Sequence, residues 1–252
     1  MAKVPVAVQM YTLRDLTSKD FVGTLEKVAA IGYAGVELAG TGGLSAAELK
    51  GVLARLKLAP AGAHVGIESF EGDLEKTMAY YSELGCKTLI VPWLSEDRRK
   101  GPDGWAKLGR FLEEVGGKLK ARGLSLAYHN HDFEFQKVDG KYALDVLFEA
   151  APKNLKMELD LYWAKRGGED PHAYAAKYSG RVTHLHVKDM AAGPDKHFAP
   201  VGTGVIDFSK IFAEASSWGV EWFVVEQDDC YGTPPLDAIA TSFKNLQKAG
   251  VV

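Results

Sequence analysis

The chain has 252 residues, of which 46% are hydrophobic and 25% charged, and roughly 250 residues is the usual size of one α/β barrel. Its formal net charge of -3 excludes the large basic surface with which nucleic-acid-binding proteins neutralise phosphates, so we expect no DNA or RNA partner. The first residues lack the long apolar stretch of a signal peptide, and later runs fall short of the roughly 18 apolar residues of a membrane span. We therefore expect a cytoplasmic protein without membrane contact.

Short β-branched or apolar runs alternate along the chain with longer segments in which apolar residues recur every three or four positions. This alternation is typical of parallel βα units. The predicted strands cover residues 4–11, 34–39, 58–65, 87–94, 124–131, 155–163, 181–189 and 221–227. The predicted helices cover residues 19–31, 45–57, 71–84, 103–121, 142–150, 171–178, 207–217 and 235–249.

Eight such units with no linker between them predict a single-domain (β/α)8 TIM barrel over residues 1–252. A doubly wound open sheet is the alternative architecture. That fold would want a glycine-rich turn after its first strand, where this chain reads YTLRD. The two cysteines, Cys86 and Cys230, lie far apart without a metal-binding spacing, and we expect both to be reduced.

Polar side chains near the carboxyl ends of the strands are the informative ones, because barrel enzymes build their sites there. The first four predicted strands contribute side chains that we predict to contact a substrate, namely Gln9, Tyr11, Glu37, His64 and Trp93. Taken alone, any one of them is as well explained by a structural role.

The last four predicted strands offer imidazole, carboxylate, imidazole and carboxylate groups to one cavity. Because side chains alternate along a strand, His129 shares a face with His131, and His186 shares one with His184 and Lys188. Buried charges at matching depth are costly unless they are paired or bind a metal. We predict one divalent metal ion, Mn, Zn, Co, Fe or Mg, bound by imidazole and carboxylate groups of these strands.

Other polar residues permit two interpretations. Glu158 lies one inward layer deeper than Asp160 and is either an ion-pair partner or a site residue, and Glu134 is either a group behind the site or solvated. His172 and His197 are expected at the surface. Gly202 and Gly204 lie where barrels often bind phosphate, but Asp207 is better explained as the N-cap of the next helix.

Six segments resemble the xylose isomerase-like barrels grouped as sugar phosphate isomerases/epimerases, which include inosose dehydratase and hydroxypyruvate isomerase. They are GYAGVEL, AYHNHDFEF, MELDLYWA, HLHVKD, GTGVIDF and VVEQD, and together they span nearly the whole chain. The resemblance implies one divalent metal, bound at the ends of strands five to eight by His129, Asp160, His186 and Glu226. It places Lys188 and His131 close to the substrate.

One departure bears on the reaction. Isomerases and epimerases of this kind usually carry Glu where this chain has His129, and two metal-bound carboxylates then shuttle a proton between the faces of an enediolate. The AYHNH segment resembles the inosose-dehydratase-like branch, which implies one base, Glu226 or His131, and a proton donor, Lys188 or another histidine. Trp163 stands where other members often carry His, which suggests a stacking wall for a sugar ring.

The predicted function is therefore a metal-dependent sugar isomerase or epimerase that removes a proton α to the carbonyl of a keto sugar or cyclitol, with an enediolate intermediate. The alternative is an inosose-dehydratase-like lyase or keto-sugar hydratase. More remote alternatives are an endonuclease IV-like hydrolase, which needs more metal ligands and a basic crescent, and a sugar-binding barrel without catalysis. The expected partner is a small carbohydrate, and a homo-oligomer is compatible with the sequence.

Overall fold

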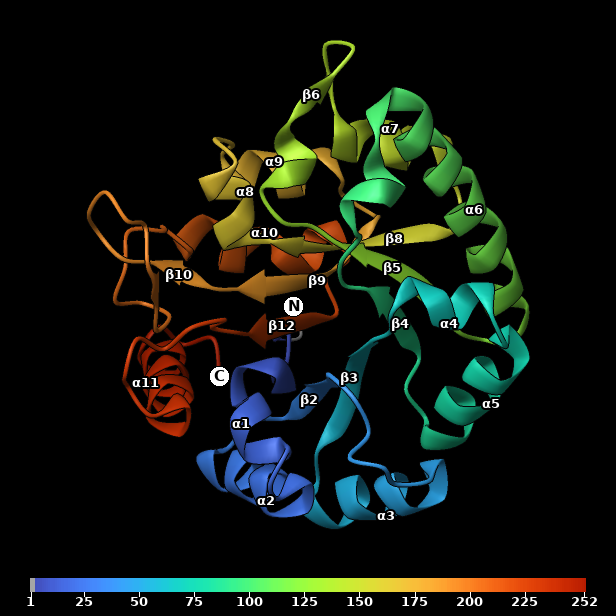
Figure 1. Cartoon of the computed structure of the whole chain (residues 1–252). Coiled ribbons are helices and arrows are strands. Elements are labelled where there is room, and N and C mark those ends of the chain that lie inside the picture. Colours follow the sequence, from blue (N-terminus) through green and yellow to red (C-terminus); the bar gives the residue numbers. More distant parts are fainter. Residues whose placement is uncertain (1–2) are drawn as a thin grey trace.

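Eight parallel strands of the computed structural model, which describes residues 3–252, close into a barrel inside a ring of helices (Figure 1). The closed order is β1-β12-β9-β8-β5-β4-β3-β2, so the (β/α)8 barrel predicted from the sequence is confirmed. The barrel strands are β1 (Val6–Gln9), β2 (Gly35–Leu38), β3 (Ala59–His64), β4 (Thr88–Val91), β5 (Ser125–His129), β8 (Leu155–Asp160), β9 (Val182–Val187) and β12 (Trp222–Val225).

The helices predicted from the sequence form with shifts of a few residues at their ends. They are α2 (Phe21–Ile31), α3 (Ala46–Leu56), α5 (Leu74–Leu84), α6 (Gly101–Ala121), α7 (Ala143–Ala150), α9 (Pro171–Lys177), α10 (Ser209–Trp218) and α11 (Pro235–Lys248). Local signals set these limits: Ser45 and Glu48 form a capping box at the start of α3, and Gly32, at φ 113°, ends α2 in the left-handed conformation.

Short elements follow the carboxyl ends of the strands and were not predicted. They are η1 (Met10–Leu13), α1 (Arg14–Thr17), α4 (Ile67–Glu71), η2 (Glu96–Arg99), η3 (Phe133–Phe135), α8 (Leu161–Arg166), and two hairpins, β6 (Lys137–Val138) with β7 (Lys141–Tyr142) and β10 (Asp189–Met190) with β11 (Phe198–Ala199). Figure 1 shows β6 and β10 projecting beyond the ring of helices.

All eight strand predictions ran one to three residues past the observed carboxyl end. The strand expected over 155–163 stops at Asp160. Its side chain accepts a hydrogen bond from the backbone N–H of Trp163 and caps α8, so Trp163 is helical. The strand over 4–11 stops at Gln9, which caps η1 in the same way through Tyr11. The strands over 87–94 and 124–131 end at Val91 and His129.

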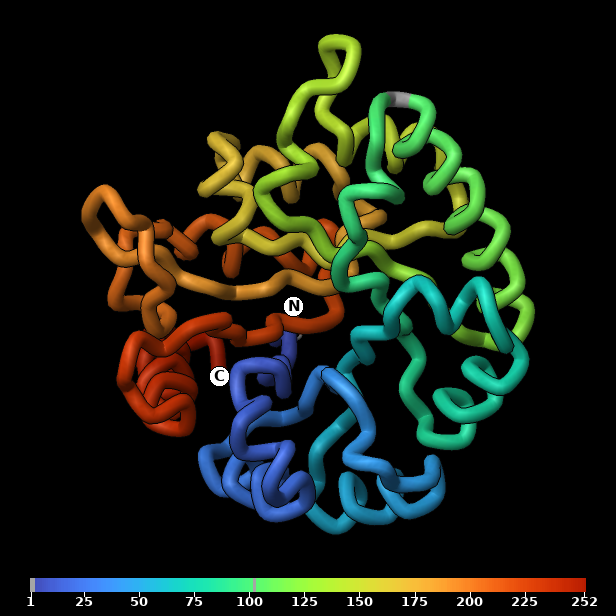
Figure 2. The backbone as a smooth tube through the Cα atoms, in the orientation of Figure 1, coloured from blue at the N-terminus to red at the C-terminus, as the bar shows by residue number. Residues whose placement is uncertain are grey.

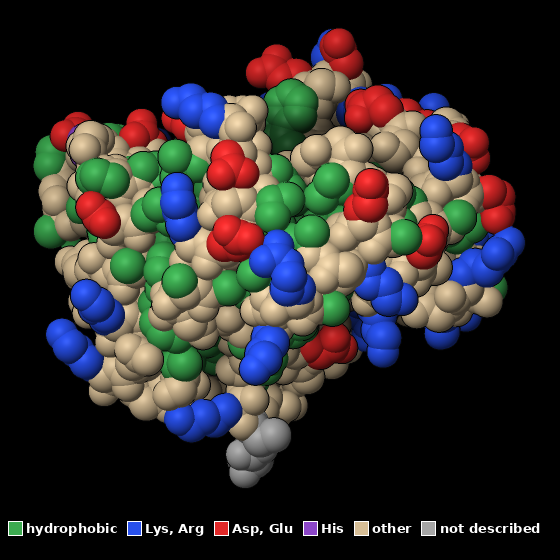
Figure 3. Space-filling model, turned by 90° about the horizontal axis from the view of Figure 1, so that it is seen from below, with side chains coloured by type: hydrophobic (Ala, Val, Ile, Leu, Met, Phe, Trp, Pro, Cys, Tyr) green, Lys and Arg blue, Asp and Glu red, His purple; other side chains and the backbone are tan. Residues whose placement is uncertain are grey.

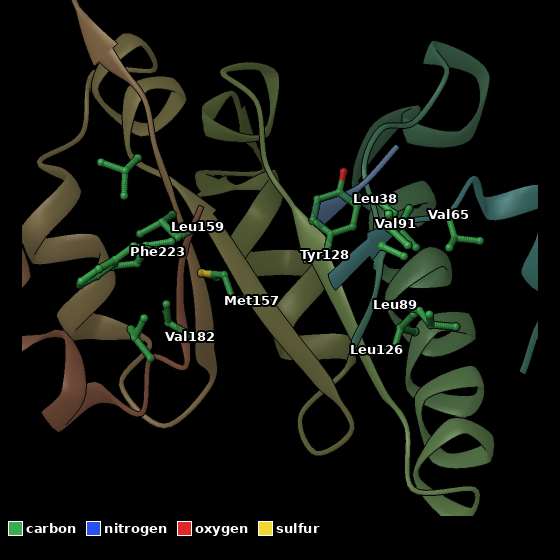
Figure 4. Close-up of a cluster of buried hydrophobic side chains, with 14 of the residues drawn as sticks. Leu38, Val65, Leu89, Val91, Leu126, Tyr128, Met157, Leu159, Val182 and Phe223 are labelled. Carbon is green, nitrogen blue, oxygen red and sulfur yellow. The ribbon is translucent and has the colours of Figure 1, made fainter. Parts of the chain in front are cut away.

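The apolar core lies between the strands and the helices (Figure 4). Leu126 and Tyr128 of β5 and Met157 and Leu159 of β8 point outward into it, and all four are fully buried. The residues between them therefore point into the barrel, as strand alternation requires. The deep interior is lined by a small cluster, Ala7, Ala61 and Val224, and above it the inward side chains are polar.

Lys3 lies close to the carboxyl-terminal residue Val252 (Figure 2). The Lys3 ammonium donates a hydrogen bond to the Val252 carbonyl at 3.3 Å. Acidic and basic side chains are interspersed over the face shown in Figure 3. None of the helices formed by residues 3–252 has the length and apolar character of a membrane span.

Candidate metal centre and active site

The four predicted metal ligands converge at the carboxyl end of the barrel. His129 ends β5, Asp160 ends β8, His186 lies near the end of β9, and Glu226 directly follows β12. Each offers one ligand atom, and these atoms all lie within 4.8 Å of one another. All four residues are buried, with at most 4% of their surface exposed.

The contacts among these groups fit a divalent cation. His186 Nδ1 lies 2.9 Å from Glu226 Oε2 and 3.8 Å from Asp160 Oδ2, and His129 Nε2 lies 4.0 Å from the same Asp160 oxygen. Asp160 Oδ2 is buried, and its charged neighbour at 3.0 Å is the Lys188 ammonium, whose approach does not have hydrogen-bond geometry. Imidazole nitrogen and carboxylate oxygen are ligands that Mn, Zn, Fe and Co share. The residues present therefore fit the predicted metal.

The barrel interior is rich in acidic groups, since Glu37, Glu158, Asp160 and Glu226 are all buried there. Burial raises the pKa of Asp160 to about 6, against the lowering effect of Lys188 and His186. Burial lowers the pKa of His186, but Glu158, Glu37 and Glu226 outweigh it and raise that pKa well above its usual value. In the metal-free chain, imidazole protons thus offset part of the negative charge, and a cation would replace them.

His129 is in the opposite state. Burial and the positive charge of its neighbours hold its pKa well below the usual value. A neutral imidazole keeps a lone pair free, which is the form that binds a metal.

Asn130 ties the ends of two ligand-bearing strands together. Its side-chain oxygen accepts the Asp160 backbone N–H at 2.9 Å, and its amide donates to the Asp160 carbonyl at 3.5 Å and the His131 carbonyl at 3.4 Å. This side chain therefore fixes the end of β5, and with it His129, against the end of β8.

His131 lies just beyond β5 and still reaches the site. Its ring packs edge-on to that of His129, with centroids 5.1 Å apart, and is stacked parallel to Phe133 at 5.5 Å. Within the described residues, its buried Nδ1 has no hydrogen-bond partner. Burial, together with the charge of Lys188, lowers the pKa of His131 to about 3, so this imidazole is neutral at pH 7.

Glu134 secures the His131 backbone from behind. Its Oε2 accepts the His131 N–H at 2.8 Å, and its Oε1 accepts the Tyr128 hydroxyl at 2.7 Å. The residue is fully buried, and burial raises its pKa to about 8. Of the two interpretations of Glu134, the structure supports the group behind the site.

Lys188 brings a buried ammonium group to the same cavity. Its Nζ lies 2.6 Å from Glu226 Oε2, 3.0 Å from Asp160 Oδ2 and 3.0 Å from Asp228 Oδ2. Burial lowers its pKa, but these three carboxylates outweigh burial and raise that pKa well above its usual value. Lys188 therefore stays protonated, and it is a hydrogen-bond donor beside the predicted cation.

Aromatic rings form one wall of the site. The Trp163 ring on α8 lies 5.3 Å from the His131 ring and 5.7 Å from the Phe198 ring, and the Lys188 ammonium lies 5.8 Å from it. Trp163 Nε1 is buried without a hydrogen-bond partner in residues 3–252. The predicted stacking residue thus stands next to the metal ligands, although it comes from a helix.

The substrate contacts predicted from the first four strands fall into two groups. Gln9 and Glu37 are buried inside the barrel, where the Gln9 amide donates to Glu37 Oε2 at 2.6 Å, and His64 Nε2 lies 3.0 Å from the same oxygen. Tyr11 and Trp93 are exposed at 46% and 53%. These two lie in segments that follow β1 and β4, at the rim of the barrel.

Glu158 joins the inner group, where it pairs with three histidines. Its Oε2 lies 2.8 Å from His64 Nε2, 3.1 Å from His129 Nδ1 and 3.2 Å from His186 Nε2. Burial lowers the pKa of His64, but Glu37 and Glu158 outweigh it and raise that pKa to about 9.

Sequence reasoning missed Asp228 and Asp189. Asp228 shares strand parity with Glu226, which was an available signal for its contact with Lys188. Asp189 accepts the N–H groups of Gly202 and Gly204 at 2.9 and 2.8 Å, so a carboxylate of the chain itself holds the loop considered for phosphate. The prediction of Asp207 as the N-cap of the next helix is wrong by one residue, because α10 begins at Ser209 with Phe208 as its N-cap; Asp207 still accepts the Ser209 backbone N–H at 2.9 Å. His197 is exposed, and His172 is half-buried beside Glu214.

Comparison with known proteins identifies the family. The sequence pattern described as xylose isomerase-like TIM barrel matches residues 25–249. The chain belongs to this family. A solved sugar phosphate isomerase/epimerase from Parabacteroides distasonis superposes with a TM-score of 0.86 at 24% identity, covering 100% of this chain and 96% of that one.

Two curated relatives are similar in sequence to this chain. The rhizopine catabolism protein MocC of Rhizobium meliloti is 24% identical over 261 residues, covering 89% of this chain and 80% of that protein. Inosose dehydratase of Lacticaseibacillus casei is 26% identical over 152 residues, which is 52% of this chain. That match spans 50% of the dehydratase, so the likeness concerns about half of its length.

Proposed function

We propose that this chain is a divalent-metal-dependent enzyme that removes a proton from the carbon next to the carbonyl of a keto sugar or cyclitol. The observation that carries the proposal is the convergence of His129, Asp160, His186 and Glu226 in a buried acidic cluster of side chains. When bound, the metal would polarise the carbonyl and stabilise the negative charge that develops as the proton leaves.

The chain's own residues supply the remaining functions. His131 is the proposed base, because its Nδ1 is buried, neighbours the ligands and has no hydrogen-bond partner in residues 3–252. Lys188 donates a hydrogen bond to a substrate oxygen, since its ammonium is held at the ligand oxygens of Asp160 and Glu226. Trp163 forms an apolar wall against which a sugar ring packs.

Among the outcomes of enolisation, loss of a β-hydroxyl fits this site better than two-carboxylate epimerisation. Epimerisation needs a proton acceptor on each face of the substrate, and an imidazole, that of His129, stands where the second carboxylate would be required. His129 Nε2 faces Asp160, as expected of a metal ligand. The curated relatives named inosose dehydratase support a dehydration.

The test is incubation with keto sugars and inososes in deuterated water, with Mn2+ or Co2+ added and products followed by mass spectrometry. Wild-type protein should incorporate deuterium at the α-carbon, and in a dehydration the product should also lose one water. His131→Gln should slow exchange by about 10²-fold or more, as expected for loss of a general base. His172→Gln, which lies beside Glu214 and outside the site, is the matched control. Exchange that survives His131→Gln unchanged would refute His131 as the base, and absence of exchange with every substrate would refute enolisation.

A further inference from the structure

Beneath the metal ligands lies a second layer of buried polar groups, formed by Gln9, Glu37, His64 and Glu158. Glu37 on β2 reaches across the barrel interior, where its Oε2 lies 2.7 Å from His186 Nε2 on β9. Glu37 is completely buried. Through this hydrogen bond, Glu37 contacts the predicted metal ligand His186 from the lower layer.

Both nitrogens of His186 face carboxylates, but only those at Nδ1 belong to the predicted ligand set. Nε2 faces two carboxylate oxygens, Glu37 Oε2 at 2.7 Å and Glu158 Oε2 at 3.2 Å. A neutral imidazole carries one N–H, and a lone pair on Nε2 would be repelled by the lone pairs of these oxygens. Nδ1 also lies at hydrogen-bonding distance from a carboxylate oxygen, Glu226 Oε2 at 2.9 Å, but a bound cation would take the place of its proton. In the metal-bound chain the single N–H would therefore lie on Nε2, and the lone pair of Nδ1 would be offered to the cation beside Asp160 and Glu226.

The carboxylate of Glu37 is itself fixed in place. Gln9, the neighbour of Glu37 in the β1–β2 register, donates its amide N–H to Oε2 at 2.6 Å. His64 Nε2 approaches the same oxygen at 3.0 Å and supplies positive charge. Because Gln9 and His64 both hold this oxygen, it can in turn hold the His186 ring in one orientation.

We propose that Glu37 is a positioning residue, which accepts the His186 Nε2–H and so fixes the tautomer and ring orientation in which Nδ1 is offered to a divalent cation. The inference rests on the proposed metal-dependent function. Carboxylates that receive the second N–H of a metal-binding histidine typically strengthen metal binding 10- to 100-fold.

A second cation in this lower layer is the competing explanation. His64, His129, Glu158 and His186 also offer ligand atoms within 4.8 Å of one another. However, His129 and His186 belong to both sets, so filling both would require each ring to bind a cation through both nitrogens. The oxygens of Glu37 and Glu158 already lie at hydrogen-bonding distance from imidazole nitrogens, which favours the positioning role.

The experiment is calorimetric titration of metal-free protein with Mn2+ and Zn2+, comparing wild type, Glu37→Leu and Glu37→Gln. Glu37→Leu removes the acceptor and should raise the Kd by about 10- to 100-fold. Glu37→Gln keeps an amide oxygen that can accept the N–H, and it should retain much of the affinity. Glu113→Gln is the control outside the site, a half-buried glutamate on α6 whose carboxylate accepts the backbone N–H groups of Lys153 and Asn154. It should leave the Kd unchanged.

A second measurement reports the tautomer directly. In Zn2+-loaded protein with 15N-labelled histidine, the His186 ring should show a slowly exchanging Nε2–H, retained in Glu37→Gln and lost in Glu37→Leu. Equal Kd values for wild type and Glu37→Leu, or two cations bound per wild-type chain, would overturn the positioning role while leaving metal binding intact. A wild-type chain that binds neither cation would instead overturn the proposed function on which it rests.

Discussion

Replacing Lys188 with Met should destabilise the metal-free protein strongly and make its stability depend on added metal. The Lys188 ammonium is 1% exposed and contacts Glu226, Asp160 and Asp228 at 2.6 to 3.0 Å. Removing one partner of such a buried pair costs about 3–5 kcal/mol, because the remaining charges are left uncompensated. For a domain of this size, that loss corresponds to a fall in Tm of about 6–20 °C.

The assay is urea and thermal unfolding of wild type and Lys188→Met, in chelator and in excess Mn2+. The difference in unfolding free energy between the two proteins should be largest in chelator. It should become smaller with Mn2+, since a cation bound by Asp160 and Glu226 offsets the negative charge that the lysine no longer balances. Lys141→Met is the matched control. Its ammonium also contacts a carboxylate, that of Glu149 at 2.7 Å, but both side chains are 59% exposed, and such pairs contribute about 1 kcal/mol or less. A Lys188→Met protein within about 1 kcal/mol of wild type in chelator would refute the reasoning.

Two further predictions concern stability. Burial raises the pKa of Glu134 from 4.5 to about 8, so the folded chain keeps this proton at pH values where the unfolded chain has released it. The stabilisation from the protonated carboxyl group should therefore be lost as the pH rises from 4.5 to 8. The loss has an upper limit of about 5 kcal/mol. The free energy of unfolding, measured in urea across this pH interval, should change less with pH for Glu134→Gln than for wild type. Parallel pH profiles for the two proteins would contradict the raised pKa. Gly204→Ala would place a Cβ against the Met190 carbonyl oxygen and the Asp189 carboxylate, and it should cost about 1–3 kcal/mol of unfolding free energy. Gly51→Ala, whose Cβ meets nothing within 4 Å, should be neutral or stabilising. A Gly204→Ala protein as stable as wild type would mean that the loop is free to move.

The barrel and the convergence of the candidate metal ligands could be predicted from the sequence, because strand periodicity fixes which side chains point into the barrel. Strand alternation placed His129, Asp160 and His186 inside the barrel, and the shared carboxyl end of parallel strands brought them to one depth with Glu226. The outward alternation, as in Leu126 and Tyr128, predicted the core beneath the helices in the same way.

The ends of the strands could not be predicted with the same success. In 155–163 the apolar run continues past Asp160, but this side chain caps the turn of α8, and Trp163 enters the site from a helix. A capping aspartate and an inward-facing strand aspartate look alike in sequence. The distinction depends on backbone direction, which the neighbouring β9 and the loop after β5 decide.

The sequence by itself determined the architecture through local periodicity, and its motifs predicted the family and a set of candidate metal ligands. Only the tertiary structure decided which groups meet across the barrel: Glu37 with His186, Lys188 with Asp228, and the glycine loop with Asp189. Such contacts join residues from different strands and loops, and their distances depend on how the closed sheet staggers its strands, a property that no local pattern encodes.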